Sequence, residues 1–189
     1  RIKSVFTIHN IQYQGKYGTE LLNDVLGIAP EYNNLILYDG LVNFMKAGIE
    51  CANKVTTVSP TYAKEILDPW FSHGLDPILN QRSWKLCGIL NGIDVENYNP
   101  ETDKNIAVNY SSSDFSGKAQ CKKALQEEMG LEKRADVPLV AMVTRLVSHK
   151  GLDLVKAVAD ELLNTQDVQL VVLGSGDWQY ESFFKELAA

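Results

Sequence analysis

The stretch Val143-Thr144-Arg145-Leu146-Val147-Ser148-His149-Lys150-Gly151 joins an apolar run to a run with helical periodicity. Residues 139–143 are all apolar, which predicts a strand buried on both faces. Residues 152–158 carry apolar side chains at helical spacing. In open parallel sheets, ligands bind beyond the carboxyl ends of strands and beside helix N-termini. The stretch therefore predicts a strand-to-helix turn at a ligand-binding edge.

Two cations, Arg145 and Lys150, flank this turn. A helix N-terminus presents unpaired N–H groups and a partial positive charge, and both attract anions. A guanidinium fork and an ammonium group would complete a site suited to a diphosphate. The alternative is that both residues are ordinary surface cations in a chain with 18 lysines and arginines. The spacing alone leaves both interpretations open.

The second half of the chain has the pattern strand, turn, helix, strand, turn and helix from Val137 onward. This pattern predicts a βαβα unit with a right-handed crossover. Its second turn, Gly174-Ser175-Gly176-Asp177, begins like a dinucleotide fingerprint but has Gln179 in place of the third glycine. A tight turn that needs small residues is the alternative to nucleotide binding. Upstream, residues 118–129 predict a helix that ends at Gly130.

In the first half, residues 4–8 predict a strand that ends at His9-Asn10, followed by a loop over residues 11–18. A histidine at a strand end is commonly structural, but the tyrosines and glycines of this loop favour a functional role. Further elements are predicted as a helix over 41–52, a strand over 54–58 and a strand over 86–90. Two more helices are predicted from Ser59-Pro60 to Leu67 and from Asp76-Pro77 to Trp84, each with its first residue as the N-cap and a proline in the first turn.

Three irregular features complete the chain. Residues 68–74 predict an aromatic loop whose rings cover the core, with a binding role as the alternative. Asn91-Gly92 predicts a turn in which both residues accept positive φ. The polar residues from there to about Asp114 lack periodicity and predict a linker between two domains.

The composition excludes several classes of function. The chain has 189 residues, a net charge of −6 and no basic block, so no nucleic-acid partner is expected. No apolar run approaches the length of a membrane span, so no membrane partner is expected. His9, His73 and His149 lack metal-ligand spacing, and motifs for a phosphate loop or a serine nucleophile are absent, so we expect neither metal nor cofactor. The missing initiator methionine and the uncapped final helix predict a piece of a longer protein.

Six groups of segments resemble signatures of bacterial glycogen synthases and plant starch synthases, in the same order and at similar spacing. These segments are Phe6–Gly15, Asn43–Gly48, Thr57–Ala63, Leu90–Asp94 with Asn99–Asp103, Thr144–Leu146 with Lys150–Asp153, and Gly174–Asp177. The resemblance implies an α/β fold with two Rossmann-like domains of the GT-B type, each only partly present. Residues 1–90 would end the N-terminal, acceptor-side domain, 91–115 would form the hinge, and 116–189 would begin the nucleotide-donor domain.

The activity that the resemblance implies is transfer of glucose from ADP-glucose to the non-reducing 4-OH of an α-1,4-glucan, with retention. Arg145 and Lys150 would hold the donor phosphates, and His9 would contact the transferred glucose. Retention without a nucleophile suggests front-face attack, with the departing ADP accepting the proton. The location would be the cytoplasm, or the plastid in a plant. The choice between ADP-glucose and UDP-glucose stays open.

The resemblance also implies binding residues. Asn10 and Tyr13 would contribute to the substrate site, Asn91 would lie near the donor, and Gly174 and Asp177 would be turn residues of the donor domain. The family's Lys-x-Gly-Gly and Glu-Pro-Cys-Gly motifs are not in this sequence, so the site is expected to be incomplete. One alternative is a non-catalytic nucleotide- or glucan-binding α/β module. Another is a sugar-nucleotide epimerase or oxidoreductase, against which the incomplete glycine motif argues.

Overall fold

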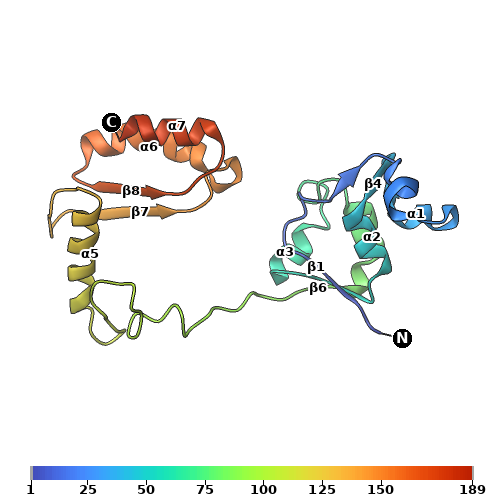
Figure 1. Ribbon diagram of the computed structural model, residues 1–189, viewed down its shortest axis with the longest axis horizontal. Coiled ribbons are helices and arrows are strands. Elements are labelled where there is room, and N and C mark those ends of the chain that lie inside the picture. Colours follow the sequence, from blue (N-terminus) through green and yellow to red (C-terminus); the bar gives the residue numbers. More distant parts are fainter. Residues whose placement is uncertain (1, 189) are drawn as a thin grey trace. The chain divides into compact units, whose positions relative to one another are not determined.

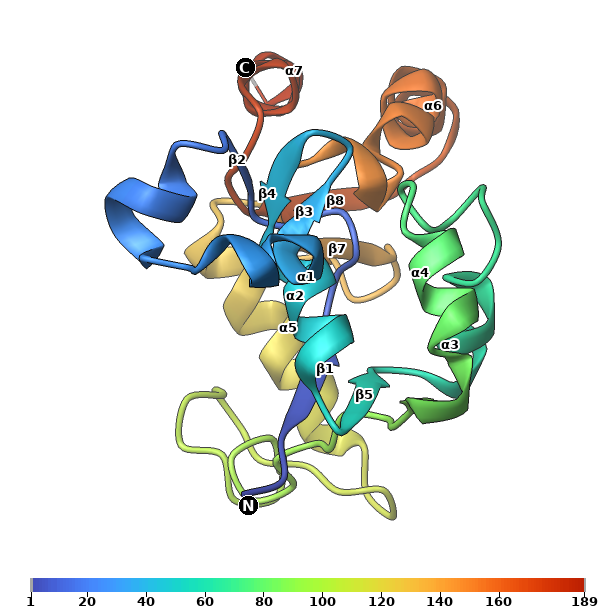
Figure 2. The same cartoon turned by 90° about the vertical axis from the view of Figure 1, so that its right-hand side faces the viewer.

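A parallel sheet of three strands forms the centre of the first half of the computed structural model, which describes residues 2–188. Its strands are β1 (Val5–Ile8), β5 (Lys54–Thr57) and β6 (Leu86–Gly88), in the order β1-β5-β6. Three helices, α2 (Phe44–Cys51), α3 (Pro60–Glu65) and α4 (Asp76–Gln81), lie beside this sheet (Figures 1 and 2). The buried core consists of Ile8, Ile11, Met45, Ile49, Ala52, Val55, Ile66, Leu75, Ile78 and Leu79.

The chain divides into two compact units, Arg1–Ile93 and Asp94–Ala189. The first unit also contains a small antiparallel sheet in the order β2-β4-β3, with strands β2 (Lys16–Tyr17), β3 (Leu37–Tyr38) and β4 (Leu41–Asn43). The short helical segments Leu22–Leu26, Pro30–Tyr32 and α1 (Asn33–Ile36) lie between β2 and β3 in the sequence. No helix among the described residues has both the length and the apolar character needed to cross a membrane.

The antiparallel sheet corrects two predictions from the sequence. Residues 11–18 are not all loop, because Lys16 and Tyr17 pair with β4. Residues 41–52 are not one helix, because 41–43 form β4 and only 44–51 are helical. Asn43 marks the change: its backbone is extended, and its side chain accepts a hydrogen bond from the Lys46 amide. The spacing of apolar residues did not reveal this change from strand to helix, because a short buried strand and a buried helical turn have similar apolar patterns.

The predicted cap at Ser59 is confirmed, whereas the one at Asp76 is wrong. The Ser59 hydroxyl accepts hydrogen bonds from the amides of Thr61 and Tyr62, at 3.1 and 3.2 Å. Helix α4 has Leu75 at its N-cap position without a side-chain cap, and Asp76 is its first helical residue. The Asp76 carboxylate instead accepts a hydrogen bond from the Ser72 hydroxyl at 2.7 Å.

The aromatic loop over residues 68–74 does not cover the core. Trp70 is 86% exposed and Phe71 is 47% exposed, whereas Leu75 is fully buried. His73 and Gly74 both have positive φ, 50° and 86°. This left-handed pair redirects the backbone so that Leu75, rather than the rings, enters the core.

The connecting residues 89–115 contain no helix or strand, as predicted. The turn expected at Asn91-Gly92 is wrong, because neither residue is among those with positive φ. The Ile89 amide donates to the Thr57 carbonyl at 2.8 Å, so the chain continues the line of β6 and leaves the sheet extended. Side-chain hydrogen bonds shape turns farther along this segment: the Asp94 carboxylate accepts from the amide and side chain of Asn97 and from the Glu96 amide, which lowers the pKa of Asp94.

The second unit has the predicted βαβα order. Helix α5 (Ser116–Glu128) precedes β7 (Leu139–Val143), α6 (Leu152–Thr165), β8 (Gln169–Leu173) and α7 (Trp178–Leu187). Strands β7 and β8 pair in parallel from Leu139–Gln169 to Val143–Leu173. The stop of α5 at Gly130 is confirmed. Gly130 has φ 68°, and the amides of Gly130 and Leu131 donate to Glu127 and Gln126 as in a Schellman motif.

Strand β7 is not buried on both faces, contrary to the prediction. Helices α6 and α7 lie on the same side of the two strands (Figures 1 and 2). Met142 and Val172 pack against the helical core formed with Leu152 and Phe184. Val143 and Leu173, which pair with each other and alternate to the other face, are 76% and 65% exposed. Within the described residues, helices therefore cover only one face of this sheet.

Candidate functional site

The turn after β7 has the geometry that its sequence predicts. Leu146 is buried, with 3% exposure, and packs with Leu152, Tyr180 and Phe184. Residues Ser148–Lys150 form one 3-10 turn, and Gly151, with φ 72°, leads into α6. Because Leu146 anchors the middle of the loop, the side chains of Arg145 and Lys150 stay exposed before and after it.

Backbone hydrogen bonds connect the loop after β8 to the turn after β7. The Leu146 amide donates to the Ser175 carbonyl, and the Asp177 amide donates to the Leu146 carbonyl, both at 2.8 Å. A Cβ at Gly174 would lie 1.9 Å from the Thr144 carbonyl oxygen. A Cβ at Gly176 would lie 2.3 Å from the Leu146 carbonyl oxygen. Both glycines are thus required by close approach of the neighbouring loop, not by a tight turn, and neither has positive φ.

The charges around these loops leave the two cations available. Within residues 2–188, neither Arg145 nor Lys150 takes part in an ion pair or a side-chain hydrogen bond, whereas Arg134 pairs with Asp136 and Asp167. The N-terminus of α6 follows Lys150 directly, and its N-cap residue, Gly151, provides no side-chain cap. The site can therefore offer two free cations and helix N–H groups to one anion.

Asp153 is the acidic group in the first turn of α6. Its carboxylate accepts a hydrogen bond from the Tyr180 hydroxyl at 2.9 Å. Burial of the Tyr180 ring, followed by this carboxylate, raises the pKa of the tyrosine hydroxyl. The contact connects the start of α6 to α7, so the Asp153 carboxylate has a structural partner.

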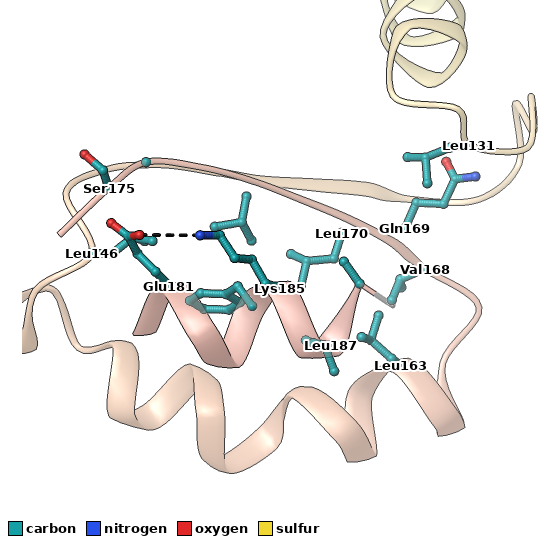
Figure 3. Close-up of a pocket in the computed structure, with 14 residues that line it drawn as sticks. Leu131, Leu146, Leu163, Val168, Gln169, Leu170, Ser175, Glu181, Lys185 and Leu187 are labelled. Carbon is teal, nitrogen blue, oxygen red and sulfur yellow. Dashed lines mark ion pairs between the residues drawn. The ribbon is translucent and has the colours of Figure 1, made fainter. Parts of the chain in front are cut away.

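An apolar hollow of the second unit lies between β8 and α7, with a volume of about 630 Å³ (Figure 3). Its lining includes Leu163, Leu170 and Leu187, and only one ion pair, Lys185 with Glu181 at 3.7 Å, occurs among the residues drawn. The Glu181 carboxylate also accepts from the Gly176 amide at 2.8 Å. This lining suits apolar groups and not phosphate, so the candidate anion site is the loop of Arg145 and Lys150.

In the first unit, His9, Asn10 and Tyr13 share the loop at the carboxyl end of β1. His9 and Tyr13 are exposed, and Asn10 is half-buried. The Asn10 side-chain oxygen accepts from the Gln12 amide at 2.9 Å, and its carbonyl accepts from the Tyr13 amide at 3.3 Å. Asn10 therefore shapes the turn that presents the other two side chains.

Asn91 lies in the same unit, in the extended segment after β6, and is exposed. Because β1 and β6 run parallel in one sheet, Asn91 and His9 both follow strands at its carboxyl edge, with β5 between them. Arg145, Lys150, Gly174 and Asp177 form the paired loops of the other unit. The candidate residues thus fall into two groups, one in each unit.

Sequence reasoning missed a buried polar network beneath the His9 loop. Gln14 and Asn43 are 4% and 0% exposed, and their side chains are hydrogen-bonded to each other. No periodicity or charge pattern identifies such residues. The only signal was a glutamine between Tyr13 and Gly15 in a loop otherwise rich in exposed groups.

Both units place polar loops beyond the carboxyl ends of parallel strands, which is the arrangement of Rossmann-like α/β proteins. Residues 1–81 match the family of starch synthase catalytic domains. The catalytic domain of starch synthase IV from Arabidopsis thaliana, bound to ADP and acarbose, superposes with a TM-score of 0.86 at 35% identity. That match covers 98% of this chain and 38% of the starch synthase chain.

Curated relatives extend the similarity over both units. The glycogen synthase of Ligilactobacillus salivarius is 50% identical over 99% of this chain, and that of Bacillus subtilis is 46% identical over 98%. The chain spans only 40% and 39% of these relatives. The predicted resemblance to glycogen and starch synthases is therefore confirmed along the whole chain. The fold is α/β of the GT-B type, and this chain contains only part of the complete fold of these relatives.

Proposed function

We propose that the protein containing this chain is a glucosyltransferase of the glycogen synthase type. It transfers glucose from ADP-glucose to the non-reducing 4-OH of an α-1,4-glucan, with retention. Support comes from relatives named glycogen synthase and from a similar starch synthase structure that contains ADP and acarbose. Because those relatives are bacterial, we also propose a cytoplasmic location.

The observation that carries this proposal is the pair of free cations at the start of α6. Arg145 would engage two oxygens of the donor diphosphate through its planar fork, and Lys150 would add a point charge. Negative charge grows on the β-phosphate as the bond between C1 of glucose and its oxygen breaks. A preorganised donor aimed at such charge contributes roughly 2.7–4 kcal/mol to the transition state.

The loop after β1 would hold the glucose. His9 would orient the sugar, and Asn10 and Tyr13 would complete its surroundings, with Asn91 near the donor from the neighbouring strand end. The attacking 4-OH would approach from the face that ADP leaves, and its proton would pass to the departing phosphate. In this mechanism His9 is not a general base, and no side chain forms a covalent bond to glucose.

The two groups of residues would then belong to two domains. Residues 1–90 would end the acceptor-side domain, 91–115 would serve as the hinge, and 116–189 would begin the nucleotide-donor domain. The division of the chain into compact units at Ile93 and Asp94 supports this assignment. Gly174 and Asp177 would act in the donor domain by bracing the loop of Arg145.

A transfer assay on the full-length protein tests the proposal. Purified protein is incubated with glycogen and either ADP-glucose or UDP-glucose, and glucose incorporation and the anomeric configuration of the product are measured. We expect α-linked product and a preference for ADP-glucose. Binding of ADP or glucan without transfer from either donor would instead indicate a non-catalytic binding module.

A further inference from the structure

Three buried side chains hold the loop that carries His9. Ile8 and Ile11 are each 1% exposed and lie in the apolar core, and Gln14 follows at the same spacing with 4% exposure. Of the residues between them, His9, Gln12 and Tyr13 are exposed, and Asn10 is half-buried. Gln14 is the one polar anchor of the three, and its side-chain hydrogen bonds add to the backbone bond that its carbonyl accepts from the Met45 amide at 3.0 Å.

Both ends of the Gln14 carboxamide are used. Its Nε2 donates to the His73 carbonyl at 3.0 Å, and its Oε1 accepts from Asn43 Nδ2 at 2.8 Å. The Oδ1 of Asn43 in turn accepts from the Lys46 amide at 2.9 Å, which caps helix α2. The glutamine therefore connects the His9 loop to α2 and to the loop over residues 68–74.

The contact with His73 falls at a constrained point of the backbone. His73 has φ 50°, a conformation that few residues other than glycine adopt, and Gly74 follows with φ 86°. The Gly74 carbonyl accepts from the Tyr38 hydroxyl at 2.8 Å, and its amide donates to the Ser72 hydroxyl at 3.1 Å. The acceptor for Gln14 is thus itself fixed, so the glutamine links two loops of defined geometry.

We propose that Gln14 is a positioning residue that sets the placement of His9 and Tyr13 against the sugar; this rests on the proposed function. Site residues need placement within about 0.5 Å, which buried supporting hydrogen bonds supply. A misplacement of about 1 Å costs on the order of 10²-fold in rate. Removing the carboxamide leaves the buried Asn43 donor without its acceptor, so the loop must relax.

The first test measures catalysis and donor binding separately in the full-length protein. Gln14→Met keeps the volume and removes both hydrogen bonds, and Gln14→Glu keeps the acceptor for Asn43 but removes the donor to His73. Gln12→Met is the matched control, because Gln12 lies in the same loop with an exposed side chain. We expect both Gln14 variants to lower kcat about 10- to 100-fold, with the Kd for ADP changed less than about 2-fold. The control should change neither quantity.

The second test does not depend on activity. Hydrogen exchange is measured at the amides of Ile11, Gln12, Tyr13 and Gly74, all of which are hydrogen-bonded in the structure. Faster exchange at these four amides in both Gln14 variants, with α5 unchanged, is expected. Unchanged exchange, or kcat within about threefold of the control, would overturn the proposal. If the wild type transfers no glucose, the proposed function fails, and exchange alone decides whether Gln14 fixes the loops.

Discussion

At the residue scale, the proposed phosphate contacts depend on the difference between a guanidinium and an ammonium group. In the full-length protein, Arg145→Lys should already lower kcat severely, because lysine lacks the planar fork that engages two phosphate oxygens. Arg145→Ala should cost roughly 10²–10³ in kcat, and Lys150→Arg should be milder than Arg145→Lys. Steady-state transfer from ADP-glucose, paired with a urea melt of each variant, measures these effects.

Lys104→Ala is a suitable control for these variants, since Lys104 is an exposed cation of the connecting segment. The urea midpoints should all stay close to wild type, because exposed substitutions usually change stability by less than about 0.5 kcal/mol. Near-normal rates for Arg145→Ala and Lys150→Ala would make both residues ordinary solvated cations. A rate loss accompanied by a large fall in midpoint would make Arg145 structural.

His9 gives a prediction of a different kind at the same scale. Its proposed contact is with the sugar, so His9→Ala should lower kcat and kcat/KM together while the affinity for ADP changes little. Kinetics and calorimetric titration with ADP measure the two effects. An equal loss of ADP affinity would mean that His9 binds the nucleotide, contrary to its proposed role.

At the element scale, the strand-end loops of the second unit depend on glycine. Gly174→Ala would place a Cβ 1.9 Å from the Thr144 carbonyl oxygen, so the loop carrying Arg145 must shift. We expect a loss of about 1–3 kcal/mol of stability together with weaker ADP binding. Gly92→Ala is the control, because nothing lies within 4 Å of its Cβ position. Equal urea midpoints and ADP affinities for the two variants would contradict the close approach.

The carboxyl end of helix α2 carries a second element-scale prediction. Lys85 is 4% exposed, and its ammonium donates to the carbonyls of Glu50 and Ala52 at 3.1 and 2.7 Å. Lys85→Met should destabilise the first unit by about 1–3 kcal/mol, because these carbonyls lose their buried partner. Urea denaturation measures the loss, and a change under 0.5 kcal/mol would count against this role.

The same lysine has a defined pH dependence. Burial, followed by the charge of Arg82, lowers the pKa of Lys85. Between that lowered pKa and the unfolded value of about 10.4, the unfolded state binds more protons, so the free energy of unfolding rises with pH. The wild type should therefore gain stability relative to Lys85→Met across this alkaline window. If the stability difference between wild type and Lys85→Met stayed flat across this window, the pKa of Lys85 would not be shifted. If the difference fell, the pKa would be raised instead of lowered.

For the whole molecule, the parts of the fold with a strong local signal could be predicted. The turn at 143–151, the stop at Gly130 and the cap at Ser59 each depend on one short stretch. Predictions failed where distant groups decide the outcome. Asp76 accepts a hydrogen bond from Ser72 instead of capping α4, and the backbone at Asn91-Gly92 follows the pairing of β6 with β5. Among residues 2–188, helices cover only one face of β7.

The candidate site divides in the same way. Arg145, Lys150 and His9 were found because they follow strands and carry charge or a titratable ring. Gln14 and Asn43 were missed because a buried hydrogen bond between residues 29 positions apart leaves no periodic trace. Such long-range contacts also position the exposed site residues. The sequence alone therefore identified the candidate binding side chains but not the buried residues that hold their loops in place.

Activity is a further expectation at this scale. The chain spans about 40% of the glycogen synthase of Ligilactobacillus salivarius, and His9 and Arg145 lie in different units. We therefore expect the isolated 189-residue chain to transfer no glucose, whereas the full-length protein does. The test is to measure transfer of radiolabelled glucose to glycogen by monomeric samples of the isolated chain and of the full-length protein. Comparable rates would show that this chain holds the complete site.

The most direct measurement is a crystal structure of the full-length protein with ADP bound. We predict that the β-phosphate lies within hydrogen-bond distance, about 3 Å, of both the Arg145 guanidinium and the Lys150 ammonium, beside the N-terminus of α6. ADP bound elsewhere, for instance in the apolar hollow between β8 and α7, with Arg145 and Lys150 still in solvent, would contradict this prediction.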